Sequence, residues 1–397
     1  MHATLKEEQK SRGYAPKNSA SQKRVSLSIV FMSRLASLPR TLFSNRVSRL
    51  SFAGKERNRA RRDRTMTLSP SAESLPSPSC PSWKNDKSAA ALMRGLREAV
   101  ESCNDVTEED LSSNKFIDLL VSGSHVGHVR PDFAEALVKH GKLEAADGYA
   151  LFSKSEKGVV CFDSENRYAS SEEKTRVVAE VFEKMRELSL IPGWRSEMFP
   201  VVSDEGDVCM NVERASASLL GIKAFGVHVN GYVNSNNSGN RESKVLLWVG
   251  TRSKDKQTFP GMLDHLSAGG LPAGMAPTIC AVKELAEEAG VPEKYSEENV
   301  KSVSCVSYRM FYRECVKRDV LFCYDLELGE SFVPKPVDGE VESFELLPLE
   351  RVCEIIAFEP GRFKPNCVLV IIDFAIRKGI VTCDMPGFPE LVKALRR

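Results

Sequence analysis

Apolar residues recur at helical spacing near the middle of the chain. They stand three or four positions apart, at Ile279, Val282, Ala286 and Ala289. This spacing predicts an apolar stripe along one face of a helix. Pro277 suits the first turn, where its missing N–H costs nothing. Gly290 suits the position after the last turn, which favours a left-handed backbone. The pattern therefore predicts a helix over residues 277–289.

The polar side of this helix carries three glutamates, Glu284, Glu287 and Glu288. Their spacing of i, i+3 and i+4 predicts that the carboxylates share one face, where like charges repel by roughly 0.2–0.5 kcal/mol per pair. A hard cation such as Mg²⁺ would turn this repulsion into binding, because it prefers oxygen ligands and usually bridges carboxylates to substrate phosphates. Taken alone, the helix also fits a plain solvated surface element.

Three glycines stand before the helix, at Gly269, Gly270 and Gly274. Because glycine lacks a Cβ, the backbone there can approach a ligand more closely than a side chain would allow. We therefore expect these glycines to contribute to substrate binding, and their presence favours the cation-site interpretation of the helix.

Runs rich in β-branched and aromatic residues surround this segment and predict strands. They cover residues 224–233, 244–251, 263–268, 300–312, 319–328 and 340–347. Two helices are predicted after them, over residues 349–358 and 365–378. Strands with helices on both sides imply an α/β/α sandwich with a mixed sheet.

The region before the sandwich, residues 89–221, is predicted to be a smaller α+β domain of unclear role. A helix at 89–102 precedes a strand, a glycine turn, a second strand and a helix that opens at Pro131. Two more short strands are predicted within residues 148–162. Ser170 and Glu173 have the spacing of a capping box ahead of a long amphipathic helix.

Four further residues of this region are of types that often line binding sites. His125 and His128 are interpreted as surface or packing residues, because no acidic or cysteine partner is apparent near them in the sequence. Trp194 and Phe199 fit either a pocket for an aromatic ring or a core at the junction of two domains.

The charge distribution is asymmetric along the 397 residues. Residues 1–65 hold sixteen Lys and Arg against four Asp and Glu, which leaves 39 basic and 50 acidic residues in the remainder. An acidic body argues against nucleic acid as a partner. No membrane partner is expected either, because the apolar run at 25–32 is too short for a span.

The basic tail is rich in Ser and poor in acids, which is the composition of an organelle transit peptide. Residues 69–82 alternate Ser and Pro as a disordered linker does. A basic arm that stays in the cytoplasm is the alternative. Composition alone does not separate chloroplast from mitochondrion.

Eleven cysteines are scattered without a Cys-x-x-Cys pair or a cluster of Cys and His. The sequence therefore supports neither a zinc site nor a disulfide framework. Buried thiols in a reducing compartment are expected, with Cys280 as a small packing residue of the 277–289 helix.

Four regions follow from these patterns. They are a tail and linker at 1–88, the α+β domain at 89–221, the sandwich at 222–363 and a C-terminal helical extension at 364–397.

Residues 269–291 resemble the Nudix box, the loop–helix–loop signature of hydrolases that cleave nucleoside diphosphates linked to other groups. Counted from Gly269, the match places Lys283-Glu284-Leu285, Glu287-Glu288 and Gly290-Val291 on the expected positions. Two positions depart from the signature. Met275 stands where the first Glu belongs, and Lys283 replaces Arg, which keeps the positive charge but loses the planar fork.

Other segments are similar to one branch of the Nudix hydrolases, related to the Nudix half of fungal thiamin pyrophosphokinase fusions and represented in plants by organellar members. They are residues 126–133, 194–195, 254–266, 319–328, 338–344 and 363–367. The resemblance covers about residues 115–397. A separate kinase domain has no room after the sandwich, so kinase activity is not expected.

This resemblance implies hydrolysis of thiamin diphosphate analogues, especially oxidised or damaged forms, to the monophosphate and phosphate. It implies Mg²⁺, with Mn²⁺ as an alternative, held by Glu284 and Glu288, and Glu287 as a further ligand or the general base. Glu340 and Glu342 are alternative bases. The plant members imply an organelle, the chloroplast in preference to the mitochondrion.

Two other functions fit the same residues. One is a general nucleoside-diphosphate or ADP-ribose hydrolase. The other is a non-catalytic diphosphate-binding sensor, which Met275 in place of the first box glutamate motivates. The oligomeric state is left open.

Overall fold

The computed structural model describes residues 86–113, 115–142, 150–156, 158–162, 168–236 and 243–397. The predicted tail and linker lie outside these residues, apart from positions 86–88. None of the helices in the described part of the chain combines the length and the apolar character that crossing a membrane requires.

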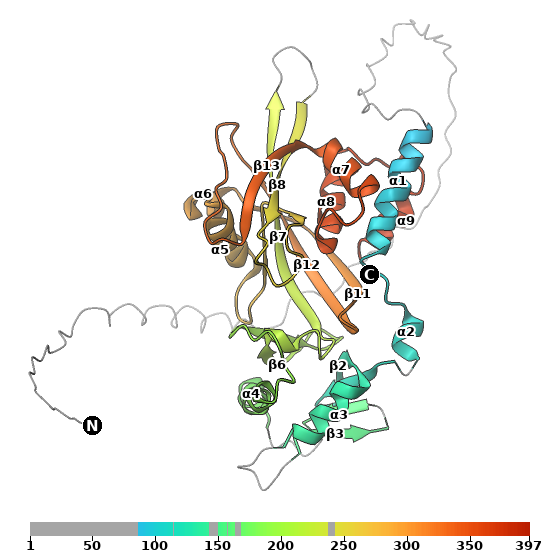
Figure 1. The fold of residues 1–397 in the computed structure, drawn as a ribbon, viewed down its shortest axis with the longest axis vertical. Helices are drawn as coiled ribbons and strands as arrows, with labels where there is room; N and C mark the ends of the chain where they lie inside the picture. Colours follow the sequence, from blue (N-terminus) through green and yellow to red (C-terminus); the bar gives the residue numbers. More distant parts are fainter. Residues whose placement is uncertain (1–85, 114, 143–149, 157, 163–167, 237–242) are drawn as a thin grey trace, which may run out of the picture. The chain divides into compact units, whose positions relative to one another are not determined.

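A seven-stranded mixed sheet forms the centre of the C-terminal half (Figure 1). Its main path runs β11-β12-β7-β8-β13, with β10 paired to β7 and β9 paired to β8. β12 lies parallel to β7, and the other pairs are antiparallel. The strands are β7 (Lys223–Asn236), β8 (Ser243–Arg252), β9 (Leu263–Asp264), β10 (Ser267–Gly270), β11 (Lys301–Tyr312), β12 (Cys315–Glu327) and β13 (Val341–Pro348).

Helices cover both faces of this sheet, because successive side chains of a strand point to opposite sides. Val227 and Val229 of β7 pack with α5, whereas Tyr232 of the same strand packs with α7 and α8. The predicted α/β/α sandwich is therefore confirmed. Its helices are α5 (Pro277–Ala289), α6 (Glu293–Asn299), α7 (Leu349–Phe358), α8 (Pro365–Arg377) and α9 (Phe388–Ala394).

Helix α1 (Asp86–Glu101) also packs on the sandwich, although the sequence places it with the N-terminal domain. Leu92, Leu96 and Val100 lie in the same core as α7 and α8. The close approach depends on Gly95, since a Cβ added there would lie 2.3 Å from a backbone oxygen of α7. The apolar face of α1 is thus buried by elements far along the chain, which the sequence pattern does not reveal.

Helix α8 differs from its expected place as well. The sequence makes residues 364–397 an extension, but α8 is buried continuously from Asn366 to Ala375 between the sheet and its neighbouring helices. Ten consecutive buried residues belong to the interior of a domain rather than to an appendage.

The N-terminal domain has a four-stranded sheet with the order β2-β1-β4-β3, and a two-stranded ribbon, β5-β6. Its expected features are present: α3 begins at Pro131, and Ser170 and Glu173 cap α4 reciprocally. The elements are α2 (Glu108–Ser112), β1 (Ile117–Val121), β2 (Ser124–Val129), α3 (Pro131–His140), β3 (Phe152–Ser155), β4 (Gly158–Cys161), α4 (Ser171–Glu187), β5 (Met198–Val202), β6 (Val208–Glu213) and the short helix η1 (Arg214–Ser216).

The β5-β6 ribbon joins this domain to the sandwich. The N–H of Ala273, in the segment before α5, donates to the carbonyl of Met198 in β5 at 2.8 Å. Phe199 is buried in the N-terminal core, and Trp194 packs against that core. Of the two interpretations of these aromatic residues, the structure shows the core at a domain junction.

The β1-β2 histidines have acidic partners, which corrects the expectation from the sequence. His125 Nδ1 lies 2.6 Å from Asp204, and His128 Nδ1 lies 3.2 Å from Asp118. Asp204 stands far from both histidines in the sequence, so the fold alone brings it beside them.

Candidate active site

Helix α5 begins and ends where the sequence predicts. Pro277 is its first residue, and Gly290 closes it with a φ of +64°. The apolar stripe is placed differently, because Ile279 is 62% exposed. The buried residues are Cys280, Ala281, Val282, Leu285, Glu288 and Ala289. The buried face is therefore rotated so that it includes a carboxylate.

The three glutamates of α5 do not share one face. Glu284 and Glu288, one turn apart, are turned inward, with 18% of the Glu284 side chain and 6% of Glu288 exposed. Glu288 accepts a hydrogen bond from the N–H of Ala268 in β10 at 2.8 Å. Glu287 is half exposed and pairs with Lys283 at 2.6 Å. The fold thus brings two of the three predicted site carboxylates together.

Both inward carboxyl groups are difficult to ionise in the absence of a cation. Burial raises the pKa of Glu288 to about 8, and the carboxylates of Asp264 and Glu284 add to the rise. Burial also raises the pKa of Glu284, against the opposing charge of Lys283. Paired acids with raised pKa values are typical of functional sites, because a bound cation or a transferred proton can stabilise them.

Two of the three glycines before α5, Gly269 and Gly270, make room for protein side chains. A Cβ on Gly269 would lie 2.2 Å from the carboxyl carbon of Glu284. A Cβ on Gly270 would meet Phe199 at 2.8 Å, and Gly274 adopts a φ of +79° in a turn. The absent Cβ of Gly269 therefore lets Glu284 lie against the sheet.

The two departures from the box signature have clear places in the fold. Met275 packs against the core under α5, so a thioether stands where the signature has a carboxylate. Lys283 lies 3.8 Å from Glu284 and 2.6 Å from Glu287, and the positive charge stays beside the carboxylates as expected.

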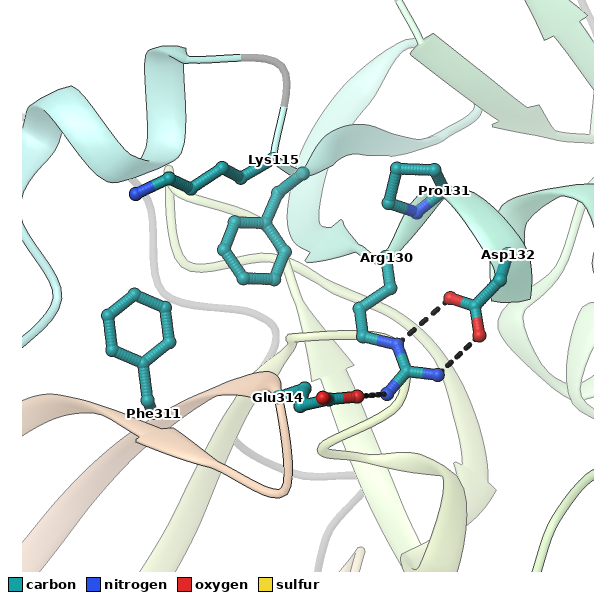
Figure 2. A pocket seen from close by; sticks show the side chains of 7 residues that line it. Lys115, Arg130, Pro131, Asp132, Phe311 and Glu314 are labelled. Atoms are coloured by element: carbon teal, nitrogen blue, oxygen red, sulfur yellow. Dashed lines mark hydrogen bonds and ion pairs between the residues drawn. The ribbon is translucent and has the colours of Figure 1, made fainter.

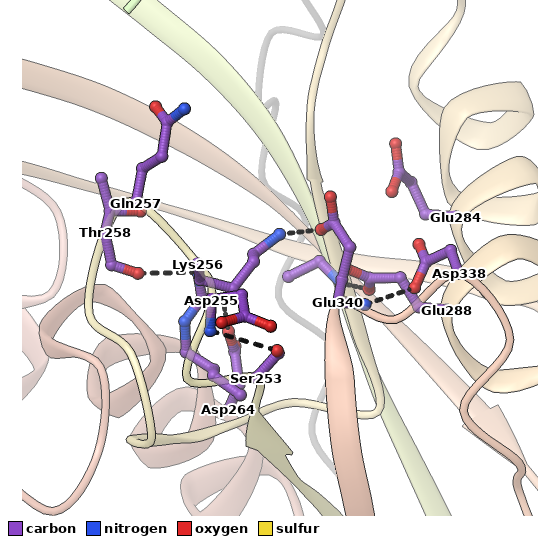
Figure 3. Close-up of polar contacts among 12 residues, drawn as sticks. Ser253, Asp255, Lys256, Gln257, Thr258, Asp264, Glu284, Glu288, Asp338 and Glu340 are labelled. Carbon is purple, nitrogen blue, oxygen red and sulfur yellow. Dashed lines mark hydrogen bonds and ion pairs between the residues drawn. The ribbon is translucent and has the colours of Figure 1, made fainter.

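Figure 3 shows further charged side chains beside Glu284 and Glu288, from loops outside α5. Glu340 pairs with Lys256. Asp338 accepts a hydrogen bond from the Glu340 N–H at 2.8 Å, and burial raises its pKa. Sequence reasoning named Glu340 as a candidate base but missed Asp338 and Lys256.

Glu342, the other base considered from the sequence, is half exposed and lies 3.9 Å from Lys254. Burial lowers the pKa of Lys256, with Glu288 opposing the fall, so its ammonium group loses a proton more readily than that of an exposed lysine. The structure therefore pairs Glu340 with Lys256 of the charged cluster and Glu342 with the exposed Lys254, although both carboxylates are about half exposed.

A buried ionic network centred on Asp264 lies next to Glu288. Arg252 Nη1 and Lys364 Nζ lie 2.5 and 3.2 Å from Asp264 Oδ2. Burial opposes ionisation of Asp264, but the two cations hold its pKa well below the usual range. Sequence reasoning gave these residues no role. Their only signal was that two of them stand in segments 254–266 and 363–367, which carry the family resemblance.

A cavity of about 580 Å³ lies elsewhere, between the N-terminal domain and the β11-β12 turn (Figure 2). Arg130 crosses it, bound to Asp132 and to Glu314, with 3.0 Å from its Nη1 to the Glu314 carboxylate. Because its cation is already paired and the α5 carboxylates do not line it, this cavity is not part of the glutamate site.

Comparison with family models identifies the class of protein that this fold and this acidic helix define. The model described as "NUDIX domain" matches residues 229–367, which include the whole of α5. The N-terminal domain matches a domain of unknown function, DUF4743, over residues 95–224.

Relatives extend the match across most of the chain. It is 40% identical over 312 residues to Nudix hydrolase 20, chloroplastic, of Arabidopsis thaliana, covering 77% of this chain and 78% of that protein. It is 37% identical over 305 residues to Nudix hydrolase 24, chloroplastic, of the same plant, with the same coverage. The crystal structure of DR0079 from Deinococcus radiodurans is 17% identical, covers 45% of this chain and 98% of its own, and has a TM-score of 0.35. The chain belongs to the Nudix hydrolase family and is a hydrolase of diphosphate bonds.

Proposed function

We propose that this protein is a Mg²⁺-dependent Nudix hydrolase that cleaves thiamin diphosphate analogues, especially oxidised or damaged forms, to the monophosphate and phosphate. The observation that carries the proposal is the inward pair Glu284 and Glu288, held by α5 against β10. The segments that resemble the thiamin-related branch supply the surrounding charges. Lys256, Asp338 and Lys364 all come from them.

The donor set fits Mg²⁺. Glu284 and Glu288 offer carboxylate oxygens, which hard cations prefer. Burial raises the pKa of both groups, so a bound cation would stabilise their charged forms. These two residues would hold the ion, with Glu287 as a further candidate and Mn²⁺ as an alternative metal. When bound, Mg²⁺ neutralises diphosphate charge and polarises the phosphoryl oxygens.

The protein must also accept a proton from the attacking water. Asp338 is the first candidate base, because it lies beside Glu288 (Figure 3) and burial raises its pKa. Glu340 is engaged by Lys256, and Glu287 is engaged by Lys283. We therefore place Asp338 ahead of Glu287, Glu340 and Glu342 as the general base.

A substrate panel tests the proposal. Phosphate release is measured from oxythiamin diphosphate, thiamin diphosphate, ADP-ribose and a nucleoside diphosphate, with Mg²⁺ and with Mn²⁺. We expect oxythiamin diphosphate to have the highest kcat/KM and Glu288→Gln to lower kcat at least about 10²-fold. Asp338→Asn should lower kcat more than Glu340→Gln. Glu297→Gln, an exposed glutamate on α6, is the matched control and should behave as wild type.

Other results would point elsewhere. Equal phosphate release by wild type and Glu288→Gln would remove the role given to α5. ADP-ribose hydrolysis faster than that of every thiamin compound would indicate a general nucleoside-diphosphate hydrolase. Tight calorimetric binding of diphosphates without turnover would indicate a sensor, the reading that Met275 motivates.

We also propose that residues 1–88 direct the protein to the chloroplast, in line with the two relatives named as chloroplastic. A fusion of residues 1–88 to a fluorescent protein, expressed in leaf cells, should coincide with chlorophyll fluorescence. Reporter signal in mitochondria or throughout the cytoplasm would contradict this location.

A further inference from the structure

Two histidines and a cysteine meet inside the sandwich, on the face of the sheet opposite α5. His228 stands on β7 between two valines that face α5, so its side chain points the other way. His265 lies between β9 and β10, and Cys367 lies in α8. One nitrogen of each histidine and the Cys367 sulfur lie within 4.8 Å of one another. All three residues are buried, with 3% of each histidine exposed.

Three of the four imidazole nitrogens of this cluster have no hydrogen-bond partner among the described residues. Within the described part of the chain, His228 Nδ1 and both ring nitrogens of His265 are buried and unpaired. The two rings meet edge to face with centroids 4.9 Å apart. Buried polar atoms are almost always satisfied in native proteins. Unpaired ring nitrogens on both histidines, in a cluster whose ligand atoms lie within 4.8 Å of one another, therefore point to a ligand that binds one nitrogen of each ring.

We propose that His228, His265 and Cys367 form a buried binding site for a thiophilic d¹⁰ cation, Zn²⁺ or Cu⁺. Imidazole and thiolate are the ligands that these ions select, whereas Mg²⁺ demands oxygen ligands. The site is separate from the glutamate pair, which offers oxygen atoms on the α5 side of the sheet. No local motif marks this site, because its residues come from three distant segments.

Metal binding removes one proton from the cluster. The Cys367 thiol donates to Asp264 Oδ1 at 2.7 Å, and this proton leaves to solvent as the metal–sulfur bond forms. Metal–ligand bonds of about 2.0–2.3 Å place the ligand atoms roughly 3.3–4 Å apart, so atoms that now lie within 4.8 Å of one another approach by no more than about 1.5 Å. The contraction links β7, the β9-β10 segment and α8.

The two ions differ in what they need from the surroundings. Cu⁺ in place of the thiol proton leaves the net charge beside Arg252 and Lys364 unchanged, and three ligands suffice for it. Zn²⁺ adds one positive charge and needs a fourth ligand. Asp264 Oδ1, which lies 2.7 Å from the Cys367 sulfur and would be released by the thiol proton, is the oxygen we assign to that position. Measuring how much of each ion the protein retains therefore decides which of the two it binds.

The test uses full-length protein stripped with a chelator and then offered Zn²⁺ alone, Cu⁺ alone under anaerobic reduction, or Mg²⁺ alone. After desalting, metal content is measured by plasma mass spectrometry. We expect about one equivalent of Zn²⁺ or Cu⁺ and none of Mg²⁺. Cys367→Ser should weaken retention at least about tenfold. Cys353→Ser, a fully buried cysteine of α7, is the matched control and should retain the ion.

A second measurement, made on proteins that keep all three proposed ligands, does not depend on how the cysteine variants fold. Co²⁺ bound by thiolate gives a sulfur-to-metal charge-transfer band, which we expect in the wild type and in Glu288→Gln. No retained Zn²⁺ or Cu⁺ in the wild type, or no charge-transfer band, would overturn the site. Equal loss of the ion in Cys353→Ser and Cys367→Ser would overturn it, and so would loss of the ion in Glu288→Gln.

Discussion

The fold keeps the Glu288 carboxyl group protonated up to about pH 8. Its pKa rises from 4.5 to about 8 on folding, because burial and two nearby carboxylates oppose ionisation. Between these values the unfolded chain releases a proton that the folded chain keeps. A raised pKa of this kind contributes stability at low pH, and the contribution is lost as pH rises.

In the presence of a chelator, we expect the free energy of unfolding of the wild type to fall between about pH 4.5 and pH 8 relative to Glu288→Gln. The variant keeps an acceptor for the Ala268 N–H and removes the buried acid, so it should be more stable by about 1–3 kcal/mol at pH 8. Urea unfolding of the two proteins at pH 5 and pH 8 measures the pH dependence and the difference in their free energies of unfolding. Parallel pH dependences of the two proteins would contradict the assigned pKa.

At the scale of elements, the segment from β10 to α5 works as one unit. Gly269 gives Glu284 the space to lie against β10, and Ala268 fixes Glu288 one turn later. The strand therefore positions both carboxylates of the helix, although it contributes no charged side chain of its own.

Gly269→Ala should lower kcat by about 10²-fold, because a displacement of Glu284 near 1 Å misplaces the site. Stability should change little, since the group that must move is the end of a flexible side chain. Steady-state kinetics and thermal melting measure the two effects. Gly329→Ala, where a Cβ meets nothing within 4 Å, is the control. Equal kinetics in both variants would mean that Gly269 does not serve Glu284.

The sequence predicts α5 well because its end signals are local, Pro277 at the start and Gly290 at the stop. The predicted buried face of α5 is wrong, because it includes Ile279, which is exposed. The helix is rotated so that Glu288 contacts β10, and the periodicity of apolar residues does not encode that contact. Asp338, Lys256 and the His228–His265–Cys367 cluster were beyond reach for the same reason. Asp338 and Lys256 stand 50 and 32 positions from Glu288, and Cys367 stands 102 positions from His265. Only the folded sheet brings them together.

At the scale of the whole molecule, α1 ties the beginning of the described chain to its last helices. Its apolar face completes a core shared with α7, α8 and α9. The contact is close at Gly95, where the backbone of Ala357 takes the space of a side chain.

Gly95→Ala should destabilise the protein by about 1–2 kcal/mol. Alanine is the better helix former by about 1 kcal/mol, but the added methyl group meets backbone of α7, and overpacking costs roughly 1–3 kcal/mol or more. Urea denaturation measures the difference. Glu98→Ala, on the exposed side of α1, should stay within about 0.5 kcal/mol. A stabilised Gly95→Ala protein would show that α1 does not pack on α7 in solution.

The parallel pairing of β7 with β12 has a kinetic consequence. Arg318 is the partner of Lys223, and α5 and its glycine segment lie in the chain between them. Closing so long a loop costs conformational entropy before the contacts that stabilise the closed loop have formed. The refolding rate should therefore be limited by this non-local closure, and the acid-bearing helix can gain its native setting only late on the folding pathway.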